Sequence, residues 1–205
     1  MRIRLGIVFV LTIAACTADR GAAPPPLDQE HPGRMAGDAI DSILPMAEYV
    51  RRFRVGTEET AGLGGEIHSR DTLASRVLAA TSQRDTVALS GLVVTRAEFA
   101  WLVFPEHNYA KPPYELDPAL FWAQIQSSSN KGAGRLLGRY GGTQLSFQSL
   151  ACTRDTLQTQ SERLTMWSGC TVRFTSDGNA QDAALFGTIV EYDGQVKLLG
   201  YGNEL

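Results

Sequence analysis

The residue types best suited to chemistry lie close together at residues 104–118. His107 stands beside Glu106 in this stretch, and two tyrosines, an asparagine and Glu115 follow. An imidazole next to a carboxylate can accept and return protons near neutral pH. We therefore take His107, with Glu106 or Glu115, as the candidate acid–base group. The alternative is a surface loop whose tyrosines cover the opening of a sheet.

Other motif-like strings indicate no cofactor and no metal. Ser128 and Lys131 have the spacing of the serine and lysine of penicillin-binding enzymes, but the companion S-D-N and K-T-G motifs do not follow. The glycines at 132–138 nearly match a dinucleotide fingerprint, yet they continue a helical pattern and favour close approach of that helix to a neighbour. The three histidines lack ligand spacing with a cysteine or carboxylate, so we expect no metal site.

Two helix signals flank the candidate acid–base stretch. Residues 95–98 read Thr-Arg-Ala-Glu, a capping box that predicts a helix ending near Pro105. Asp117 and Pro118 suit the N-cap and first position of a second helix. Its apolar period continues to Tyr140, so we predict a long helix there.

After this helix the apolar period changes to two. The change predicts strands at 143–152, 166–174, 184–192 and 195–201. Asp193 and Gly194 are a strong signal for a two-residue hairpin between the last two strands. Helices followed by an antiparallel meander that packs on one long helix define an α+β fold.

The order and size of these elements resemble the NTF2-like and cystatin-like superfamily, in which a curved sheet wraps a helix and forms a cone. The resemblance extends over about residues 42–205 and rests on the order of the elements. It implies a ligand pocket between the helices and the sheet. Such pockets are mostly apolar with a few polar groups, and the residues we assign to the lining are Trp101, Tyr109, Tyr114 and Trp122.

The first residues have the layout of an export signal. Arg2 and Arg4 form a positive start, an apolar run of eleven residues follows at 5–15, and small residues lead to Cys16. The run is shorter than the roughly 20 residues that span a bilayer, so we do not expect a permanent transmembrane helix.

Ile13, Ala14, Ala15 and Cys16 resemble the lipobox of bacterial lipoproteins, in which the cysteine is lipidated and begins the mature chain. The resemblance implies acyl chains on Cys16, each buried CH₂ group contributing about 0.8 kcal/mol to membrane attachment. The following Thr17 is similar to an outer-membrane address, which implies the periplasmic face of that membrane in a Gram-negative cell. The alternative is an ordinary secreted protein with a cysteine near its cleavage site.

These signals divide the chain into three segments. Residues 1–15 are the predicted signal peptide, and residues 16–36 are the lipidated cysteine with a flexible tether that is proline-rich and lacks apolar periodicity. Residues 37–205 are the predicted single α+β domain, because no linker or repeat interrupts them.

Cys152 and Cys170 are the remaining cysteines of the chain. Because an exported protein meets an oxidising compartment, we expect these two to be joined. On neighbouring strands their bond would link two rows of the sheet, and it would contribute about 3 kcal/mol in the chain-entropy model. Two separate buried thiols are the alternative.

Composition and charge favour some classes of function and argue against others. The chain of 205 residues is 43% hydrophobic and 20% charged, with a net charge of −3, which suits a globular protein and argues against nucleic-acid binding. We predict an exported envelope protein whose lipid anchor binds the membrane and whose domain binds a small ligand or a protein partner. An NTF2-like isomerase or hydratase, and a structural envelope protein without a ligand, are the alternatives.

Overall fold

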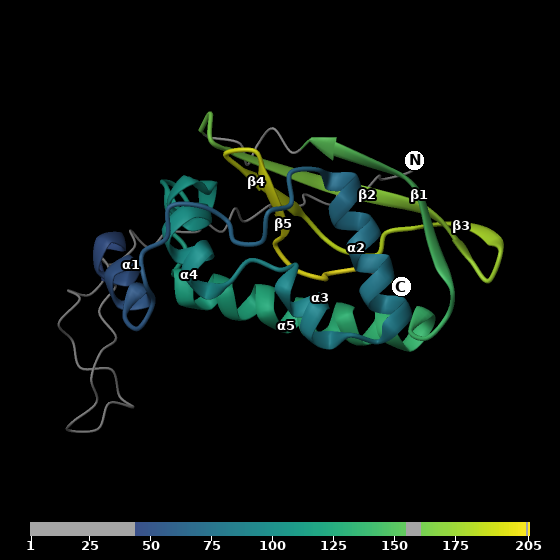
Figure 1. Cartoon of the computed structure of the whole chain (residues 1–205). Coiled ribbons are helices and arrows are strands. Elements are labelled where there is room, and N and C mark those ends of the chain that lie inside the picture. Colours follow the sequence, from purple (N-terminus) through teal and green to yellow (C-terminus); the bar gives the residue numbers. More distant parts are fainter. Residues whose placement is uncertain (1–43, 155–160, 204) are drawn as a thin grey trace, which may run out of the picture. The chain divides into compact units, whose positions relative to one another are not determined.

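The computed structural model describes residues 44–154, 161–203 and 205, which belong to the compact unit Ile43–Leu205. The predicted signal peptide, Cys16 and the tether at 16–36 lie outside the described residues. Helices come first and an antiparallel sheet follows (Figure 1), which confirms the predicted α+β fold with its long helix.

The helical part precedes the sheet in the chain. Its elements are α1 (Met46–Arg54), α2 (Arg70–Gln83), α3 (Thr86–Gly91), α4 (Arg96–Glu98), the π-helical turn η1 (Phe99–Val103), the 3₁₀ turns η2 (Phe104–Glu106) and η3 (Asn108–Ala110), and α5 (Pro118–Tyr140). The long helix begins and ends where the sequence predicts. Asp117 caps it by accepting a hydrogen bond from the Ala119 N–H at 2.7 Å, and Pro118 occupies the first turn.

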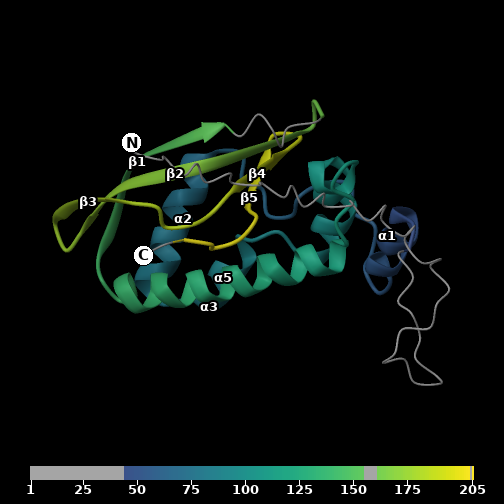
Figure 2. The ribbon, with the colours of Figure 1, turned by 180° about the vertical axis from the view of Figure 1, so that it is seen from behind.

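The strands of the described chain form one antiparallel sheet. They are β1 (Leu145–Arg154), β2 (Leu164–Ser176), β3 (Asn179–Ala183), β4 (Ile189–Tyr192) and β5 (Gln195–Leu198). The sheet has the order β1-β2-β4-β5, and β3 pairs with the C-terminal half of β2 while β4 pairs with its N-terminal half. In both views the sheet lies above α5, and α2 runs from the sheet toward that helix (Figures 1 and 2).

The strand predicted at 184–192 is shorter in the structure: only Ile189–Tyr192 forms β4, and β3 (Asn179–Ala183) lies before the predicted range. The period of two is broken because Leu185 and Phe186 are consecutive and both buried. Gly187 follows, and a Cβ added there would lie 3.0 Å from the carbonyl oxygen of Gly202. The chain therefore leaves the edge of β2 after β3 and returns to it as β4.

Two clusters of buried side chains form the core. The first joins α2 and the C-terminal half of α5 to the sheet and includes Leu73, Val77, Leu136, Val172, Phe174 and Leu198. The second joins η1 and η2 to the other end of the sheet and includes Phe99, Val103, Phe104, Leu164, Met166 and Val190. The N-terminal half of α5 packs against this second cluster through Phe121, Trp122 and Ile125.

The helix predicted from the capping box begins as expected as α4 and then continues as the wider π-helical turn η1. Thr95 and Glu98 make both hydrogen bonds of the box. From Phe99 onward the turn is π-helical, and the Phe104 N–H donates to the Phe99 carbonyl. The wider turn lets the consecutive residues Leu102, Val103 and Phe104 all be buried.

The disulfide between Cys152 and Cys170 is present and joins the neighbouring strands β1 and β2, as predicted. It lies at an irregularity in the register, since Ala151 pairs with Thr171 whereas Thr153 pairs with Ser168. Gly169, which adopts a φ of +58°, supplies the extra residue of this bulge.

Gly132 explains why the long helix contains glycine. A Cβ at this position would lie 1.6 Å from the carbonyl oxygen of Tyr201, whereas Gly134 and Gly138 have open space around them. The predicted close approach is therefore confirmed for Gly132. It brings α5 against the segment after β5, where Tyr201 is buried.

Candidate functional site

The structure places His107 inside the protein, with 1% of the residue exposed. Its Nδ1 accepts a hydrogen bond from the Tyr109 N–H at 3.1 Å and caps η3. In its neutral form the imidazole therefore carries its proton on Nε2. Glu106 is half-buried in η2. The catalytic role of these two residues stays a prediction.

Two of the four predicted pocket residues contact each other. The rings of Tyr109 and Tyr114 are 5.4 Å apart, and Tyr109 also packs on Phe121. Trp101 lies elsewhere, where its indole N–H donates to Thr57 Oγ1 at 3.1 Å and the Arg54 guanidinium stacks 3.9 Å from its ring. Their assignment to a pocket also stays a prediction.

The fourth residue, Trp122, lines a groove of about 390 Å³ between α3 and α5. Most of its lining is aliphatic or carries hydroxyl and amide groups. The lining residues are Thr86, Leu89, Ser90, Val93, Val94, Thr95, Arg96, Trp122, Gln126, Ser129, Asn130, Ala133, Leu137 and Tyr201. We refer to this site as the α3–α5 groove. Trp101, Tyr109 and Tyr114 are not part of this lining.

The spacing of residues on α5 explains how one helix serves both the core and the groove. Ser129, Gly132, Leu136 and Tyr140 are buried and face the interior, and Ser129 also borders the groove. The groove residues Trp122, Gln126, Asn130, Ala133 and Leu137 follow the same helical repeat, displaced by about one residue. The displacement turns them toward α3 rather than toward the sheet.

Tyr201 lines the groove, and both its hydroxyl and its backbone N–H are hydrogen-bonded. Its hydroxyl donates to the Leu89 carbonyl at 2.8 Å, and its backbone N–H donates to Ser129 Oγ at 3.1 Å. Burial raises the pKa of the Tyr201 phenol well above its usual value. The phenol is therefore neutral at physiological pH and positions α3 against α5.

Several polar groups along the groove have no protein partner among the described residues. The side chains of Thr86, Gln126 and Asn130 make no hydrogen bond to the described chain, and neither does the indole N–H of Trp122. The Trp122 ring is half-buried and packs 5.0 Å from Phe99. Trp122 and Gln126 are half-buried, whereas Thr86 and Asn130 are exposed, so this row can hydrogen-bond to solvent or to an external molecule.

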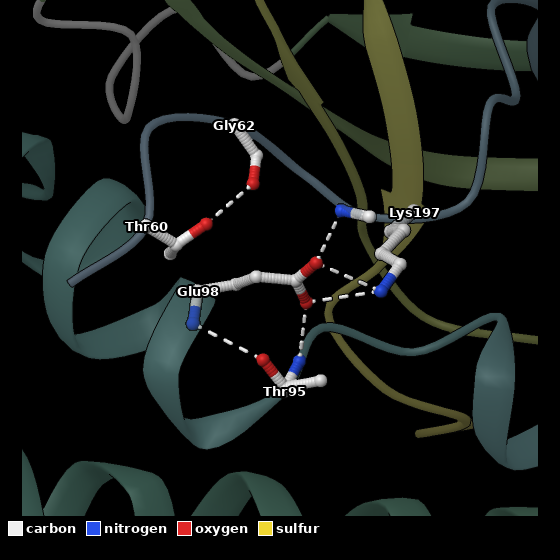
Figure 3. Close-up of polar contacts among 6 residues, drawn as sticks. Thr60, Gly62, Thr95, Glu98 and Lys197 are labelled. Atoms are coloured by element: carbon white, nitrogen blue, oxygen red, sulfur yellow. Dashed lines mark hydrogen bonds and ion pairs between the residues drawn. The ribbon is translucent and has the colours of Figure 1, made fainter. Parts of the chain in front are cut away.

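A buried ion pair adjoins one end of the groove (Figure 3). Glu98 and Lys197 each have 6% of the side chain exposed, and the Lys197 Nζ lies 2.9 Å and 3.0 Å from the two carboxylate oxygens. The backbone N–H groups of Gly64 and Thr95 donate to the same carboxylate, both at 2.6 Å. Thr95 itself lines the groove, so this network fixes the position of the groove's end.

Opposing effects act on the pKa of Glu98. Desolvation by burial raises it, but the hydrogen bonds from Lys197, Thr95 and Gly64 outweigh burial and hold the pKa below its usual value. Glu98 is therefore ionised at neutral pH and accepts hydrogen bonds as part of the fold. The capping box identified Glu98 in the sequence, whereas Lys197 gave no local signal beyond a charge within an apolar strand.

A second cleft, of about 340 Å³, lies where α2 begins near β4 and includes His68 and Trp167. Its polar groups are largely paired within the protein. The Trp167 indole N–H donates to Glu191 Oε2 at 2.8 Å, the Arg70 guanidinium stacks 3.8 Å from the Trp167 ring, and His68 Nδ1 lies 3.1 Å from the Gly194 carbonyl. These contacts join α2 to the sheet.

Comparisons with known proteins yield no relative: no family model, curated protein or solved structure matches this chain. Within residues 44–154 and 161–203, no helix is long and apolar enough to cross a membrane. The same residues contain no group of three or more His, Cys, Asp or Glu side chains that would suit a metal ion.

Proposed function

We propose that this chain is an exported, lipid-anchored binding protein of the cell envelope, and that the α3–α5 groove is its ligand site. The observation that carries the proposal is the row of polar groups without protein partners along an aliphatic groove. Thr86, Gln126, Asn130 and the Trp122 indole offer both hydrogen-bond donors and acceptors. Small-molecule sites have this composition, an apolar surface with a few orienting polar groups.

The groove suits an elongated ligand. Its α5 wall extends from Trp122 to Leu137, which corresponds to roughly 22 Å at 1.5 Å per helical residue. A ligand that lies along this wall contacts hydroxyl and amide groups on one side and aliphatic side chains on the other.

The composition of the lining favours binding over acid–base catalysis. Arg96 is the charged residue of the lining, which includes no carboxylate and no imidazole. Tyr201 stays neutral because burial raises its pKa. The NTF2-like enzyme alternative would use His107, but only 1% of that residue is exposed, and its Nδ1 already accepts a backbone hydrogen bond.

The NTF2-like resemblance itself remains part of the proposal. An antiparallel sheet with a long packed helix is compatible with that superfamily. The α3–α5 groove lies between two helices, whereas the resemblance implies a pocket between helices and sheet. The ligand site proposed here therefore rests on the groove residues and not on the resemblance.

Groove binding is tested with N-phenylnaphthylamine, an uncharged amphiphilic dye whose fluorescence increases in apolar surroundings. We expect the purified, oxidised chain to bind the dye, and Ser90→Trp to abolish binding by filling the groove at an exposed position. Ser75→Trp is the matched control, an exposed serine on α2 outside the groove. Equal dye binding by both variants would contradict the proposed site.

Anchoring is tested through Cys16. Cells that produce the wild-type chain should retain it in the membrane fraction with an acyl mass on Cys16, because acyl chains partition into the bilayer. Cys16→Ser should release the chain from that fraction or leave an unprocessed precursor without an acyl mass. A wild-type chain found without acyl groups in the soluble fraction would overturn this part of the proposal.

A further inference from the structure

We propose that the ligand of the α3–α5 groove is a single-chain amphiphile with an anionic head group, a carboxylate or a phosphate, bound at Arg96. The inference rests on the proposed function and identifies the class of ligand. It follows from an uneven distribution of charge and polarity along the groove. One end presents hydrogen-bond donors with a cation, and the other end presents aliphatic side chains beside the hydroxyl groups of Thr86 and Ser90.

Arg96 is positioned before any ligand binds. Its Nη2 donates to the Phe53 carbonyl at 2.8 Å, and its guanidinium carbon lies 4.8 Å from the centre of the Phe53 ring. Its remaining N–H groups make no hydrogen bond to the described residues. Nor is any carboxylate of the described residues paired with it, in a chain whose net charge is −3. A guanidinium fixed at one edge, with its other donors free, suits a carboxylate or phosphate.

Neighbouring groups at this end of the groove are donors as well. Thr95 Oγ1 accepts a hydrogen bond from the Glu98 N–H, so the hydroxyl proton of Thr95 can be donated outward. The Trp122 indole N–H can also donate. The nearby Glu98 carboxylate is directed toward Lys197, as Figure 3 shows, and the Lys197 ammonium compensates its charge. The backbone N–H groups of Gly64 and Thr95 donate to the same carboxylate. Arg96 therefore keeps its positive field.

The opposite end of the groove suits an acyl chain. Leu89 belongs to the first core cluster, and Ala133 and Leu137 pack against that cluster, whereas Val93 packs against both clusters. The hydroxyl groups of Thr86 and Ser90 on α3 border this aliphatic surface. The Trp122 end packs instead on the second cluster, which also contains Val94. Gln126 and Asn130 lie between the two ends on α5, where their amides can bond an ester or amide linkage.

The experiment compares dodecanoate with dodecanol, two probes of the same chain length that differ in head-group charge. Both displace N-phenylnaphthylamine from the purified chain, below their critical micelle concentrations. We expect dodecanoate to bind about tenfold or more tightly than dodecanol, because its hydrogen bonds to Arg96 are charge-assisted. Dodecyl phosphate and lauroyl lysophosphatidylglycerol, as further arms, distinguish a free acid from a lipid head group.

Variants of Arg96 test whether this residue causes the preference for dodecanoate over dodecanol. Arg96→Gln should reduce dodecanoate affinity to about that of dodecanol and should change dodecanol affinity far less, because an uncharged hydroxyl gains less from the guanidinium than a carboxylate does. Arg96→Lys should restore part of the preference, because it keeps the charge and loses the bidentate geometry. Arg76→Gln, at an exposed arginine of α2 outside the groove, should change neither affinity. Circular dichroism confirms that each variant is folded.

The outcomes separate this inference from the proposed function. Equal affinities of dodecanoate and dodecanol for the wild type, both abolished by Ser90→Trp, would leave the groove as a ligand site and overturn the anionic head group. A dodecanoate preference that persists in Arg96→Gln would overturn the role of Arg96. Failure of the dye and of every probe to bind would overturn the proposed function itself.

Discussion

The polar groups around Glu98 and those along the α3–α5 groove meet at Thr95, yet they are satisfied in different ways. The Glu98 carboxylate accepts hydrogen bonds from Lys197, Gly64 and Thr95, and the pair is almost inaccessible to solvent. In the groove, which Thr95 also lines, the side chains of Gln126 and Asn130 make no hydrogen bond within the described chain. The polar groups around Glu98 therefore hydrogen-bond to one another, whereas these two side chains of the groove have no hydrogen-bond partner within the described chain.

This difference indicates that the first set of polar groups stabilises the fold and that the second set binds a ligand. A closed buried network joins the 57–69 loop, the capping box and β5, and removing a member leaves a buried charge without its partner. An open row of polar groups on an accessible surface contributes little to folding, and removing a member affects whatever binds there. Changes in the first set should lower stability, and changes in the second set should lower affinity.

Lys197→Met should have the largest effect on stability. The substitution leaves the buried Glu98 carboxylate without its counter-ion, which typically costs about 3–5 kcal/mol. Urea unfolding of the purified chain measures the loss. Arg173→Gln is the matched control, because its ion pair with Asp182 is exposed and contributes far less. Similar losses in the two variants would contradict the structural role of the buried pair.

Gly132→Ala should have the next largest effect on stability, because it changes the packing of α5 against Tyr201 in the groove. The new Cβ would meet the Tyr201 carbonyl oxygen at 1.6 Å, and such overpacking costs about 1–3 kcal/mol, sometimes more. Gly134→Ala, with open space around it, should instead stabilise the helix by about 0.4–1 kcal/mol. Thermal unfolding of both variants checks the opposite signs. A destabilised Gly134→Ala would mean that the glycines of α5 act through helix flexibility rather than close packing.

The stability difference between wild type and Glu98→Gln should depend on pH. Because the folded pKa of Glu98 lies below its ordinary value of 4.5, the unfolded chain binds more protons between these two values. The stabilisation by the carboxylate is therefore complete above pH 4.5 and is lost as the pH falls through the folded pKa. Urea unfolding at pH 7 and at pH 3.5–5 measures the difference. A difference that grows as the pH falls would show that burial, rather than Lys197, governs the pKa.

Local signals in the sequence predicted much of the fold. Asp117 with Pro118 marked the start of α5, and the Thr95 capping box marked α4, because caps depend on neighbouring residues. Asp193 and Gly194 adopt the positive φ angles of 47° and 77° expected of the predicted hairpin turn. The pairing of Cys152 with Cys170 followed from the predicted export signal and the cysteine count.

Features that depend on distant residues were not predicted. Glu98 and Lys197 are 99 residues apart in the chain, and a lysine in a short strand gives no indication of its partner. The groove combines α3 with a face of α5 displaced by one residue from the core face, and periodicity alone does not separate these faces. Trp122 lines the groove and Trp101, Tyr109 and Tyr114 lie outside it, and the assignment of these four residues to a pocket between helices and sheet stays a prediction.

The central claim is that the open polar groups of the groove serve a ligand and not the fold. It is tested most directly by measuring, in the double variant Gln126→Ala and Asn130→Ala, both the free energy of unfolding and the affinity for dodecanoate. The account predicts a change in unfolding free energy within about 0.5 kcal/mol, together with a clear loss of affinity. A loss of about 2 kcal/mol in stability, the typical cost of breaking buried hydrogen bonds, with unchanged affinity would contradict it.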